Sequence, residues 1–291
     1  MRKILALSLM LAVGTAGAVC LTGEAVAQAT PQVPEKQTLS YGAAAAQRVE
    51  YWPGASPQSP LVAFVHGGGW TRGDMTMMDG SAKLTHWHSL GYAVASIDYR
   101  LVPQATVEDE AADVAEATAF LHGNAARLGF DASRMVLVGH SAGAHLAALI
   151  GTDPKWFNGA GLNMDAVRGV VLLDGAAYDV SRQLSIGAPL MQRTYVQAFG
   201  SNPERQKRLS PTLQAAKPNA PAFLILHVQR PDGITQSEAL AGALRAAGTA
   251  VEIHGFPGTG LAGHAAINRQ MGQADYPATA ALDRWLRQVF K

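Results

Sequence analysis

One serine in the sequence is framed by glycines in a way that could support chemistry. Residues 139–143 read Gly-His-Ser-Ala-Gly, with an apolar run before them (135–138) and a helix-like apolar run after them (144–150). At a sharp turn between a buried strand and a buried helix, only glycine fits two positions to either side of the serine. The hydroxyl is then held exposed at a helix start, where unpaired amides and the helix dipole favour negative charge. The pattern predicts that Ser141 is a nucleophile.

A second glycine cluster lies upstream of Ser141. Residues 66–70 read His-Gly-Gly-Gly-Trp and follow Leu61–Val65, a continuous apolar run typical of a central parallel strand. Backbone amides without side chains in front of them can bind the oxyanion that forms when a nucleophile adds to a carbonyl. A flexible glycine turn is the alternative, but the position upstream of the serine motif favours an oxyanion-binding loop.

A serine hydroxyl is a weak nucleophile, so it needs a base that takes its proton. Of the nine histidines, three lie well downstream of Ser141, namely His227, His254 and His264. The first two fall inside strand-like runs, where side-chain packing explains them. The third follows the last predicted strand in a glycine-rich segment that we interpret as a loop. We therefore predict that His264 is the general base.

The base needs a carboxylate that orients it. Asp232 lies in a polar segment (229–233) predicted to be a turn directly after a strand, and it is the favoured acid. Asp174, at the end of the preceding predicted strand, is its rival, whereas Asp275 follows His264 and so has the wrong order for such a site. Each aspartate could instead cap a helix or belong to a turn.

Strand-like and helix-like segments alternate along the chain, which predicts the α/β class with a doubly wound, mainly parallel sheet flanked by helices. The site is then expected at the carboxyl ends of the strands. Residues 28–291 are predicted to form a single domain. Residues 177–221 lack a clear strand and form either a small helical or irregular insertion over the site or an ordinary surface connection. Strands are predicted at 48–52, 61–65, 91–98, 135–138, 167–173, 222–228 and 251–254, and helices at 106–129, 144–150, 235–247 and 279–290.

Residues 1–27 have the features of a secretory signal peptide. Two basic residues are followed by an apolar stretch and by the small-residue site Ala25-Val26-Ala27. An uncleaved membrane anchor is the alternative, but the apolar stretch is short, so no stable membrane insertion is expected. The single cysteine, Cys20, lies in this segment, and the mature chain then has no disulfide. We expect an exported protein, periplasmic or secreted.

The charge balance excludes some functions. The net charge is +1 and no basic stripe occurs, so a nucleic acid partner is not expected. His86 and His88 have the spacing of possible metal ligands, but they lack a sufficient set of nearby carboxylates or cysteines. No metal or organic cofactor is expected.

With these residues placed, the sequence resembles the α/β-hydrolase superfamily, and within it carboxylesterases close to the hormone-sensitive-lipase-like and bacterial feruloyl-esterase-like enzymes. The motifs that carry the resemblance lie at 66–70, 98–101, 139–143 and 263–264. It implies an ester hydrolase that forms an acyl-enzyme on a small-molecule or polymer-attached ester. It implies that Ser141 is the nucleophile, His264 the base and Asp232 the acid. It also implies that the amides of Gly68, Gly69 and Ala142 bind the oxyanion.

Two other functions stay open. Residues 66–70 also resemble the His-Gly-Gly-x-Trp motif of kynurenine formamidases, which implies N-formylkynurenine-like amides as alternative substrates, although the predicted signal peptide weighs against that role. A non-catalytic binding protein on a hydrolase fold is the second alternative. One departure concerns the acid, because related esterases often carry a His-Gly-x-x-Asp turn where this chain has residues 227–232, His-Val-Gln-Arg-Pro-Asp.

Overall fold

A computed structural model describes residues 33–291. The predicted signal peptide, residues 1–27 with its cysteine, lies outside these described residues. In the part of the chain that the structure describes, every helix is too short or too polar to cross a membrane.

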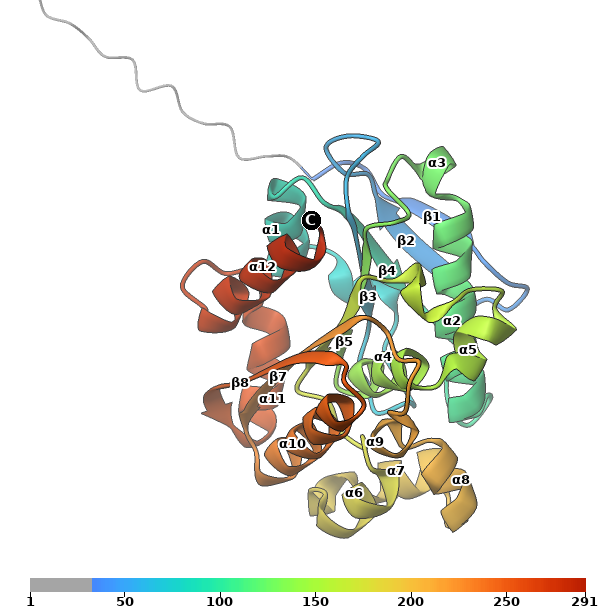
Figure 1. Ribbon diagram of the computed structural model, residues 1–291, viewed down its shortest axis with the longest axis vertical. Helices are drawn as coiled ribbons and strands as arrows, with labels where there is room; N and C mark the ends of the chain where they lie inside the picture. The colour runs from blue at the N-terminus through green and yellow to red at the C-terminus, as the bar shows by residue number, and fades with distance from the viewer. Residues whose placement is uncertain (1–32) are drawn as a thin grey trace, which may run out of the picture. The chain divides into compact units, whose positions relative to one another are not determined.

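The described residues form one eight-stranded sheet with the strand order β1-β2-β4-β3-β5-β6-β7-β8 (Figure 1). The β1–β2 and β2–β4 pairs are antiparallel and the remaining pairs are parallel. The predicted mainly parallel, doubly wound sheet is therefore confirmed. The strands are β1 Gln37–Ser40, β2 Arg48–Trp52, β3 Leu61–Val65, β4 Ala93–Ile97, β5 Met135–His140, β6 Gly169–Leu173, β7 Ala222–Gln229 and β8 Ala250–Thr259.

The central strands are buried on both faces, which explains their continuous apolar sequences. Every residue of β3, β5 and β6 is buried. Their register brings Val65 beside Gly139 and His140 beside Leu173, so the three strands end at the same edge of the sheet. The loops that follow them consequently meet, and this edge is where the sequence predicts the site.

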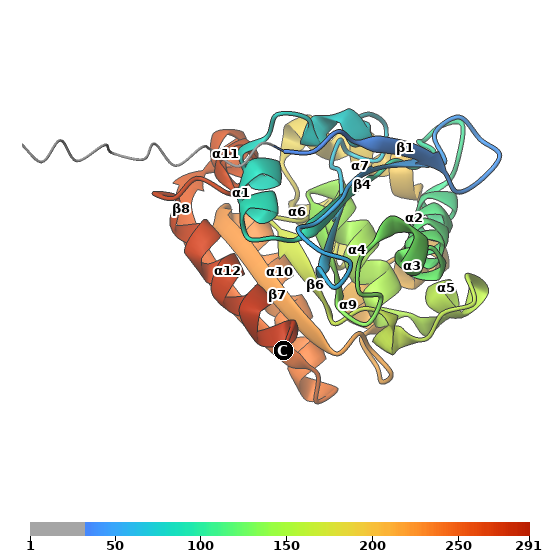
Figure 2. The same cartoon turned by 90° about the horizontal axis from the view of Figure 1, so that it is seen from above.

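Helices cover both faces of the sheet (Figure 2). One face carries α1 Ala82–Ser89, α11 Gly260–Gln270 and α12 Pro277–Val289, which pack in one apolar layer. The other face carries α2 Val107–Gly123, α3 Ala125–Leu128, α4 Ala142–Thr152, α5 Pro154–Gly159 and α10 Pro231–Ala246. Two short 3-10 turns, η1 Met75–Met78 and η2 Met164–Ala166, lie in the connections.

The helix predicted at 106–129 is divided in two. Thr106 caps α2 through a capping box with Asp109, but α2 ends at Gly123. A separate turn, α3, follows and ends at Gly129, whose φ of 77° is the left-handed conformation that glycine adopts most easily.

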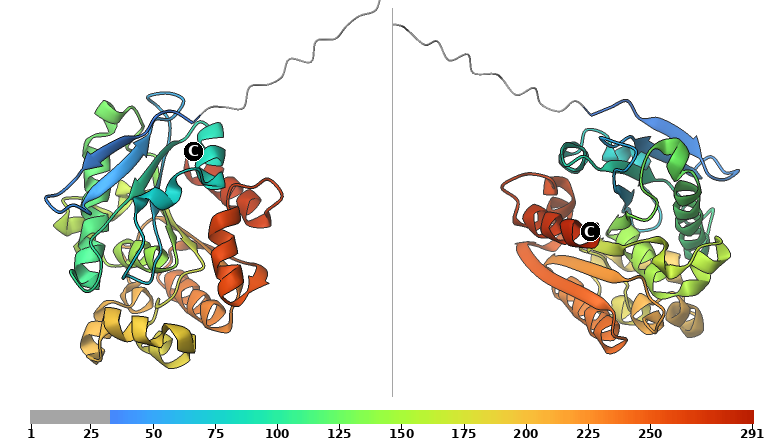
Figure 3. Two further views of the ribbon diagram at one scale, coloured as in Figure 1. Left: turned by 180° about the vertical axis from the view of Figure 1, so that it is seen from behind. Right: turned by 45° about the horizontal axis from the view of Figure 1, so that its top comes forward.

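Residues between β6 and β7 form short helices, so the segment predicted to be irregular or helical is helical (Figure 3). α9 packs between α4 and α10 and joins the segment to the sheet layer. Below, this segment is called the β6–β7 insertion. Its elements are α6 Val180–Ile186, η3 Pro189–Met191, α7 Gln192–Phe199, α8 Pro203–Arg208 and α9 Pro211–Gln214.

Candidate active site

Ser141 stands at the turn between β5 and α4, in the conformation that the glycine pattern predicts. Its φ of 56° and ψ of −119° are unusual for a residue with a side chain. The Ser141 amide donates to the Leu173 carbonyl (3.1 Å), which ties the turn to the end of β6. The hydroxyl is thus presented by the backbone and does not depend on a flexible side chain.

The two glycines of the motif are required by close backbone packing. A Cβ on Gly139 would lie 2.3 Å from the Gly143 carbonyl oxygen, and a Cβ on Gly143 would lie 2.2 Å from the Val65 carbonyl oxygen. Both contacts are with backbone, which cannot move aside cheaply. Helix α4 can therefore start directly above β3 and β5 only because these positions lack side chains.

The glycine loop after β3 lies beside Ser141. A Cβ on Gly67 would lie 3.0 Å from Ser141 Cβ. Gly68, Gly69 and Trp70 have φ values of 140°, 64° and 61°. Among the described residues, no acceptor is bonded to the Gly68 or Gly69 amide, and the Ala142 amide is free because it belongs to the first turn of α4.

His66, the residue before the glycines, holds this loop in place through buried contacts. It is fully buried, its Nδ1 donates to the Gly67 carbonyl (2.9 Å), and its Nε2 lies 3.3 Å from Asp98 Oδ1. The Tyr99 ring stacks on the imidazole with centroids 4.2 Å apart, and the Tyr99 hydroxyl donates to the His66 carbonyl (2.7 Å). The segment after β4 thus buttresses the loop.

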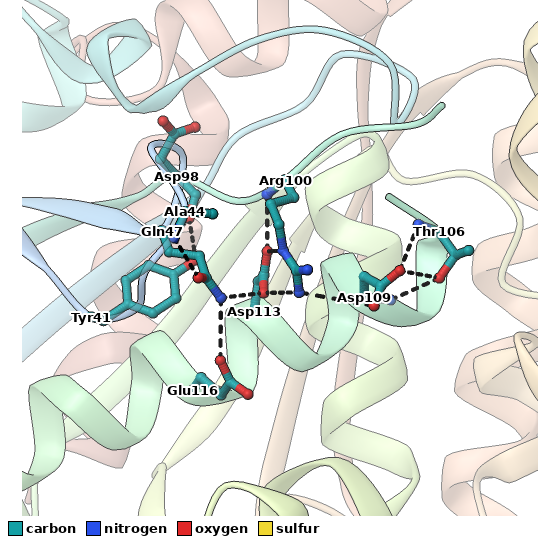
Figure 4. A network of polar contacts seen from close by, with 9 residues as sticks. All are labelled: Tyr41, Ala44, Gln47, Asp98, Arg100, Thr106, Asp109, Asp113 and Glu116. Carbon is teal, nitrogen blue, oxygen red and sulfur yellow. Dashed lines mark hydrogen bonds and ion pairs between the residues drawn. The ribbon is translucent and has the colours of Figure 1, made fainter. Parts of the chain in front are cut away.

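A polar network fixes that segment in turn (Figure 4). Arg100 Nε and Nη2 donate to the two carboxylate oxygens of buried Asp113 on α2, at 2.8 and 2.7 Å. Gln47 Nε2 donates to the same carboxylate (2.9 Å), and the Tyr41 hydroxyl donates to the Asp98 carbonyl (2.7 Å). A two-pronged arginine–carboxylate pair of this kind fixes orientation as well as charge.

Trp70 connects the glycine loop to the β6–β7 insertion. Its indole Nε1 donates to His145 Nδ1 (3.2 Å), and His145 Nε2 donates to the Leu209 carbonyl (2.8 Å). Burial lowers the pKa of His145 to about 4, so the ring is neutral, as an acceptor Nδ1 requires. The loop, α4 and the insertion are therefore joined through one buried imidazole.

Three side chains form a hydrogen-bonded line at the carboxyl edge. His264 Nε2 lies 2.9 Å from Ser141 Oγ, and His264 Nδ1 lies 2.6 Å from Asp174 Oδ2. Asp174 Oδ1 also accepts from the Val228 amide (3.1 Å). A serine, an imidazole and a carboxylate in this order can move the serine proton and stabilise the imidazolium that results.

Asp174 is buried yet kept ionised. Burial alone raises the pKa of its carboxyl, but the hydrogen bond from His264 and the nearby charge of Arg230 outweigh burial and hold the pKa below its usual value. Arg230 Nε lies 3.2 Å from Asp174 Oδ2. The carboxylate can therefore accept the Nδ1 proton of His264 as a hydrogen bond throughout the neutral pH range.

The prediction that Asp232 orients His264 is wrong, because Asp174 occupies that position. Residues 229–233 are not a turn: Arg230 is the N-cap of α10 and Pro231 is its first residue. Asp232 lies in the first helical turn, where its Oδ2 accepts from Gln183 Nε2 (3.0 Å). The predicted helix start at 235 is thus four residues late.

His264 reaches Ser141 as predicted, but from a helix and not from a loop. β8 continues to Thr259, and α11 begins at Gly260. His140 Nε2 donates to the His264 carbonyl (3.0 Å), with the two rings 4.7 Å apart. Burial and the neighbouring imidazole lower the pKa of His140 to about 3, so it is a neutral donor to the helix that carries His264.

The line of side chains opens into a cavity of about 450 Å³. One wall is the glycine loop and another is the β6–β7 insertion, which contributes η3 and α7 side chains. The lining is mostly apolar, with no aspartate or glutamate in it. The lining residues are Gly67, Gly68, Gly69, Trp70, Arg72, Met77, His140, Ser141, Ala176, Leu190, Met191, Thr194, Tyr195, Arg230, Leu261 and His264.

Sequence reasoning did not identify Arg230, Gln183 or Tyr195 as parts of the site. Arg230 and Tyr195 line the cavity, and Gln183 connects Tyr195 to Asp232. The only signal in the sequence was Pro231, whose preference for the first position of a helix places Arg230 at a helix start. Gln183 and Tyr195 lie in the β6–β7 insertion, whose sequence shows no periodic pattern of apolar residues that would place them.

The family model described as BD-FAE matches residues 51–244, which is two thirds of the chain. Esterase LipC of Mycobacterium tuberculosis is 30% identical over 210 residues, covering 67% of this chain and 51% of LipC. The carboxylic ester hydrolase LipN of the same organism is 30% identical over 225 residues, covering 71% of this chain and 59% of LipN. The chain thus spans about half the length of these curated relatives.

Solved structures show the same fold. Esterase B from Lactobacillus rhamnosis superimposes with a TM-score of 0.70 at 21% identity, covering 89% of this chain and 86% of that one. A truncated carbohydrate esterase from gut microbiota superimposes with a TM-score of 0.73 at 18% identity, covering 89% of this chain and 97% of that one. At this level of identity the likeness establishes the α/β-hydrolase fold.

Proposed function

We propose that this chain, which belongs to the BD-FAE family, hydrolyses carboxylic esters through an acyl-enzyme on Ser141. The observation that carries the proposal is the hydrogen-bonded line from Ser141 Oγ through His264 to Asp174. The esterase names of its curated relatives support the same reaction.

In the first half of the reaction, Ser141 Oγ adds to the ester carbonyl carbon while its proton passes to His264 Nε2. Asp174 accepts a hydrogen bond from Nδ1 and stabilises the imidazolium. When the tetrahedral intermediate collapses, its carbon–oxygen bond to the alcohol breaks, and His264 returns the proton to the departing alcohol. The acyl group remains on Ser141.

In the second half, water replaces the alcohol. His264 Nε2 takes a proton from the water, whose oxygen adds to the acyl carbon, and collapse releases the acid and restores the Ser141 hydroxyl. The amides of Gly68, Gly69 and Ala142 are the proposed donors to the oxyanion in both halves. In the described part of the chain no acceptor is bonded to the Gly68 or Gly69 amide, both glycines line the same cavity as Ser141, and the Ala142 amide belongs to the first turn of α4 directly after Ser141.

The cavity supports a small or polymer-attached acyl group in preference to a long free lipid chain. Its volume of about 450 Å³ is in the lower half of the range of small-molecule pockets. Trp70 and Tyr195 give it aromatic walls, while its mouth is lined by exposed Leu190 and Leu261. Turnover of a series of esters identifies the acyl and alcohol groups that the site prefers.

The test is fluorophosphonate labelling of the purified protein with peptide mapping, beside turnover of a series of p-nitrophenyl esters. Label on Ser141, absent from the Ser141→Ala variant, together with rapid hydrolysis of short esters, is the expected result. An unlabelled protein would contradict the proposal and would favour a non-catalytic binding protein.

N-formylkynurenine is included in the same series because residues 66–70 keep a His-Gly-Gly-x-Trp pattern. The same three side chains could cleave a formamide by the same steps. A higher kcat/KM for N-formylkynurenine than for every ester would keep Ser141 as nucleophile but would replace the ester by an amide as the substrate class.

Export is a separate proposal that rests on residues 1–27. When the full chain is expressed in a bacterium, we expect it outside the cytoplasm with Gln28 as its first residue. N-terminal sequencing of each cell fraction tests this. A full-length cytoplasmic protein that begins at Met1 would contradict it.

A further inference from the structure

We propose that Asp232 is a positioning residue that offsets the charge of Arg230, so that Asp174 retains its full effect on the imidazolium of His264. The proposal rests on the proposed function of Ser141, His264 and Asp174. It gives a role to a carboxylate that lies close to the site but does not touch His264 in the structure.

Arg230 lies between two buried carboxylates. Its Nε is 3.2 Å from Asp174 Oδ2, and its Nη1 is 3.8 Å from Asp232 Oδ2. Only 7% of Arg230 is exposed, compared with 1% of Asp174 and 8% of Asp232. Three charges removed from water interact far more strongly than the same charges on a surface.

The surrounding residues are shaped to hold this arrangement. A Cβ on Gly233 would lie 2.9 Å from Arg230 Nη2 and 3.3 Å from Asp174 Oδ1. Arg230 Nη2 donates to the Gly175 carbonyl (3.2 Å), which fixes the guanidinium at the end of β6. The first turn of α10 therefore leaves space where the arginine and the triad carboxylate approach each other.

The charge of Arg230 has two opposed effects. It helps Asp174 to stay ionised in a buried position, which the base requires. It also repels the positive charge that forms on His264 in the transition state, because both groups lie beside the same carboxylate. An arginine without a compensating charge would therefore weaken the stabilisation that Asp174 gives to the imidazolium.

Asp232 resolves this opposition. With its carboxylate, the group of Asp174, Arg230 and Asp232 carries a net charge of −1, and the protonation of His264 then brings the local charge to zero. Without it, the pair is neutral and the imidazolium adds an uncompensated buried charge. The arginine can thus bind the triad carboxylate without weakening its field.

The insertion holds Asp232 in place. Gln183 on α6 donates from Nε2 to Asp232 Oδ2 (3.0 Å) and to the Tyr195 hydroxyl (3.1 Å), and Gln183 is 1% exposed. Because Tyr195 lines the cavity, Gln183 connects the cavity wall to the ion pair of Arg230 and Asp232. A structural alternative exists, since a carboxylate in the first turn of α10 also stabilises the helix dipole.

The experiment measures kcat/KM against pH for p-nitrophenyl acetate with variants of Asp232 and Arg230. Asp232→Asn keeps the shape and an acceptor for Gln183 but removes the negative charge. We expect the acid limb of the profile to move to lower pH by about half a unit and the plateau to fall about threefold, because the imidazolium is less stabilised. Arg230→Gln should move the acid limb about as far to higher pH.

The double variant Asp232→Asn with Arg230→Gln should return the acid limb close to its original pH, because neither charge is then present. Arg230→Lys keeps the positive charge and should leave the acid limb unchanged, so the Arg230 pair tests the proposal even where Asp232→Asn does not fold. Asp165→Asn, an exposed residue at the opposite end of β6, is the control for losing one carboxylate. Circular dichroism verifies the fold of each variant.

Other titratable or charged side chains near His264 stay unchanged in these variants and do not account for opposed shifts. Those that line the cavity or lie on α11 and the elements packed against it are Arg72, Lys83, His86, His88, His140, His227, Glu252, His254 and Arg269. The nearby tyrosines Tyr178, Tyr195 and Tyr276 titrate above this pH range because burial raises their pKa values.

Shifts of the two single variants in the same direction, or no shift in either, would overturn the proposal, as would a loss of stability without any change in the profile. Such an outcome leaves Asp232 as a structural carboxylate of α10. The proposed function fails separately, and only if the unaltered protein neither labels on Ser141 nor hydrolyses the ester.

Discussion

The two halves of the site are built by different means. The half that carries the proposed nucleophile, Ser141 with the loop at 66–70 (the nucleophile half), is fixed by the backbone: positive φ angles, glycines against carbonyls, and strand ends in register. The half that is proposed to transfer protons (the proton-transfer half) is fixed by side chains, which connect His264 on α11 to Asp174 after β6 and to groups at the start of α10. Backbone geometry allows little variation, whereas a network of side-chain charges can be adjusted one residue at a time.

This difference indicates which substitutions should reduce activity severely and which should reduce it by smaller steps. A group that forms or breaks bonds cannot be replaced in either half. Among the supporting residues, a change in the nucleophile half displaces amides or the hydroxyl, while a change in the proton-transfer half alters charge or hydrogen bonding and leaves the groups in place.

The largest effect is expected where the two halves meet. Ser141→Ala and His264→Ala should each lower kcat for a short ester by about 10⁵ to 10⁶, and the double variant should lose little more, because the two residues act as a unit. Steady-state kinetics on p-nitrophenyl acetate measures this. Losses that multiply in the double variant would mean that the two side chains act independently.

The nucleophile half is tested next by Gly69→Ala. Gly69 has a φ of 64°, and a Cβ there would lie 2.9 Å from Thr194 Cγ2, so either the loop with its amides or the Thr194 side chain must move. We expect kcat to fall about a hundredfold to a thousandfold, the usual loss for one oxyanion donor.

Gly80→Ala is a matched control for that variant. Gly80 has a φ of 63°, and a Cβ there would meet nothing within 4 Å. The backbone strain is therefore the same, about 1–2 kcal/mol, without any displacement of the loop. Equal losses of activity in the two variants would show that strain, and not the position of the amides, controls the rate.

A smaller effect is expected in the proton-transfer half from His140→Ala. This change removes the donor to the His264 carbonyl. If that hydrogen bond stabilises the transition state more than the ground state, its loss should lower the rate about tenfold. The comparison of kcat and fluorophosphonate labelling checks this. An unchanged kcat would mean that α11 positions His264 without His140.

The smallest effect on activity, but a clear one on stability, is expected at Lys83. Its side chain is 2% exposed, Nζ donates to the Asn268 carbonyl on α11 (3.3 Å), and no carboxylate pairs with it in the described part of the chain. Burial lowers its pKa to about 8. Between that value and the ordinary one near 10.5, the unfolded state binds more protons, so Lys83 destabilises the fold less as pH rises.

Urea unfolding of the unaltered protein and of Lys83→Met at pH 7 and pH 10 tests this directly. The variant should be the more stable of the two at pH 7, by a few kcal/mol at most, and the difference should shrink at pH 10. A difference that is independent of pH would mean that packing, and not charge, sets the cost of Lys83.

The two halves also differ in how far the sequence predicts them. Ser141, its flanking glycines and the loop at 66–70 depend on backbone rules that act over a few residues, so a short motif predicts both their conformation and their neighbours. The central strands were equally clear, because burial on both faces requires continuous apolar runs.

The proton-transfer half depends on contacts between distant residues, and there the prediction was only partly correct. His264 was placed beside Ser141, yet its glycine-rich segment is the end of β8 and the start of α11, in part because Gly258 and Gly263 pack too closely for side chains. The acid was misplaced because Pro231 starts α10 and thereby directs Asp232 to Gln183. Which of two carboxylates after adjacent strands meets the imidazole depends on packing that no local pattern contains.

The most direct measurement compares kcat/KM of Asp174→Asn and Asp232→Asn for one short ester at neutral pH. If Asp174 is the acid, its variant should lose about 10³ to 10⁴ in kcat/KM, because the imidazole loses its orientation and its counter-charge, whereas the Asp232 variant should lose less than about tenfold. A severe loss in Asp232→Asn with a mild one in Asp174→Asn would contradict the assignment of the catalytic carboxylate to the end of β6.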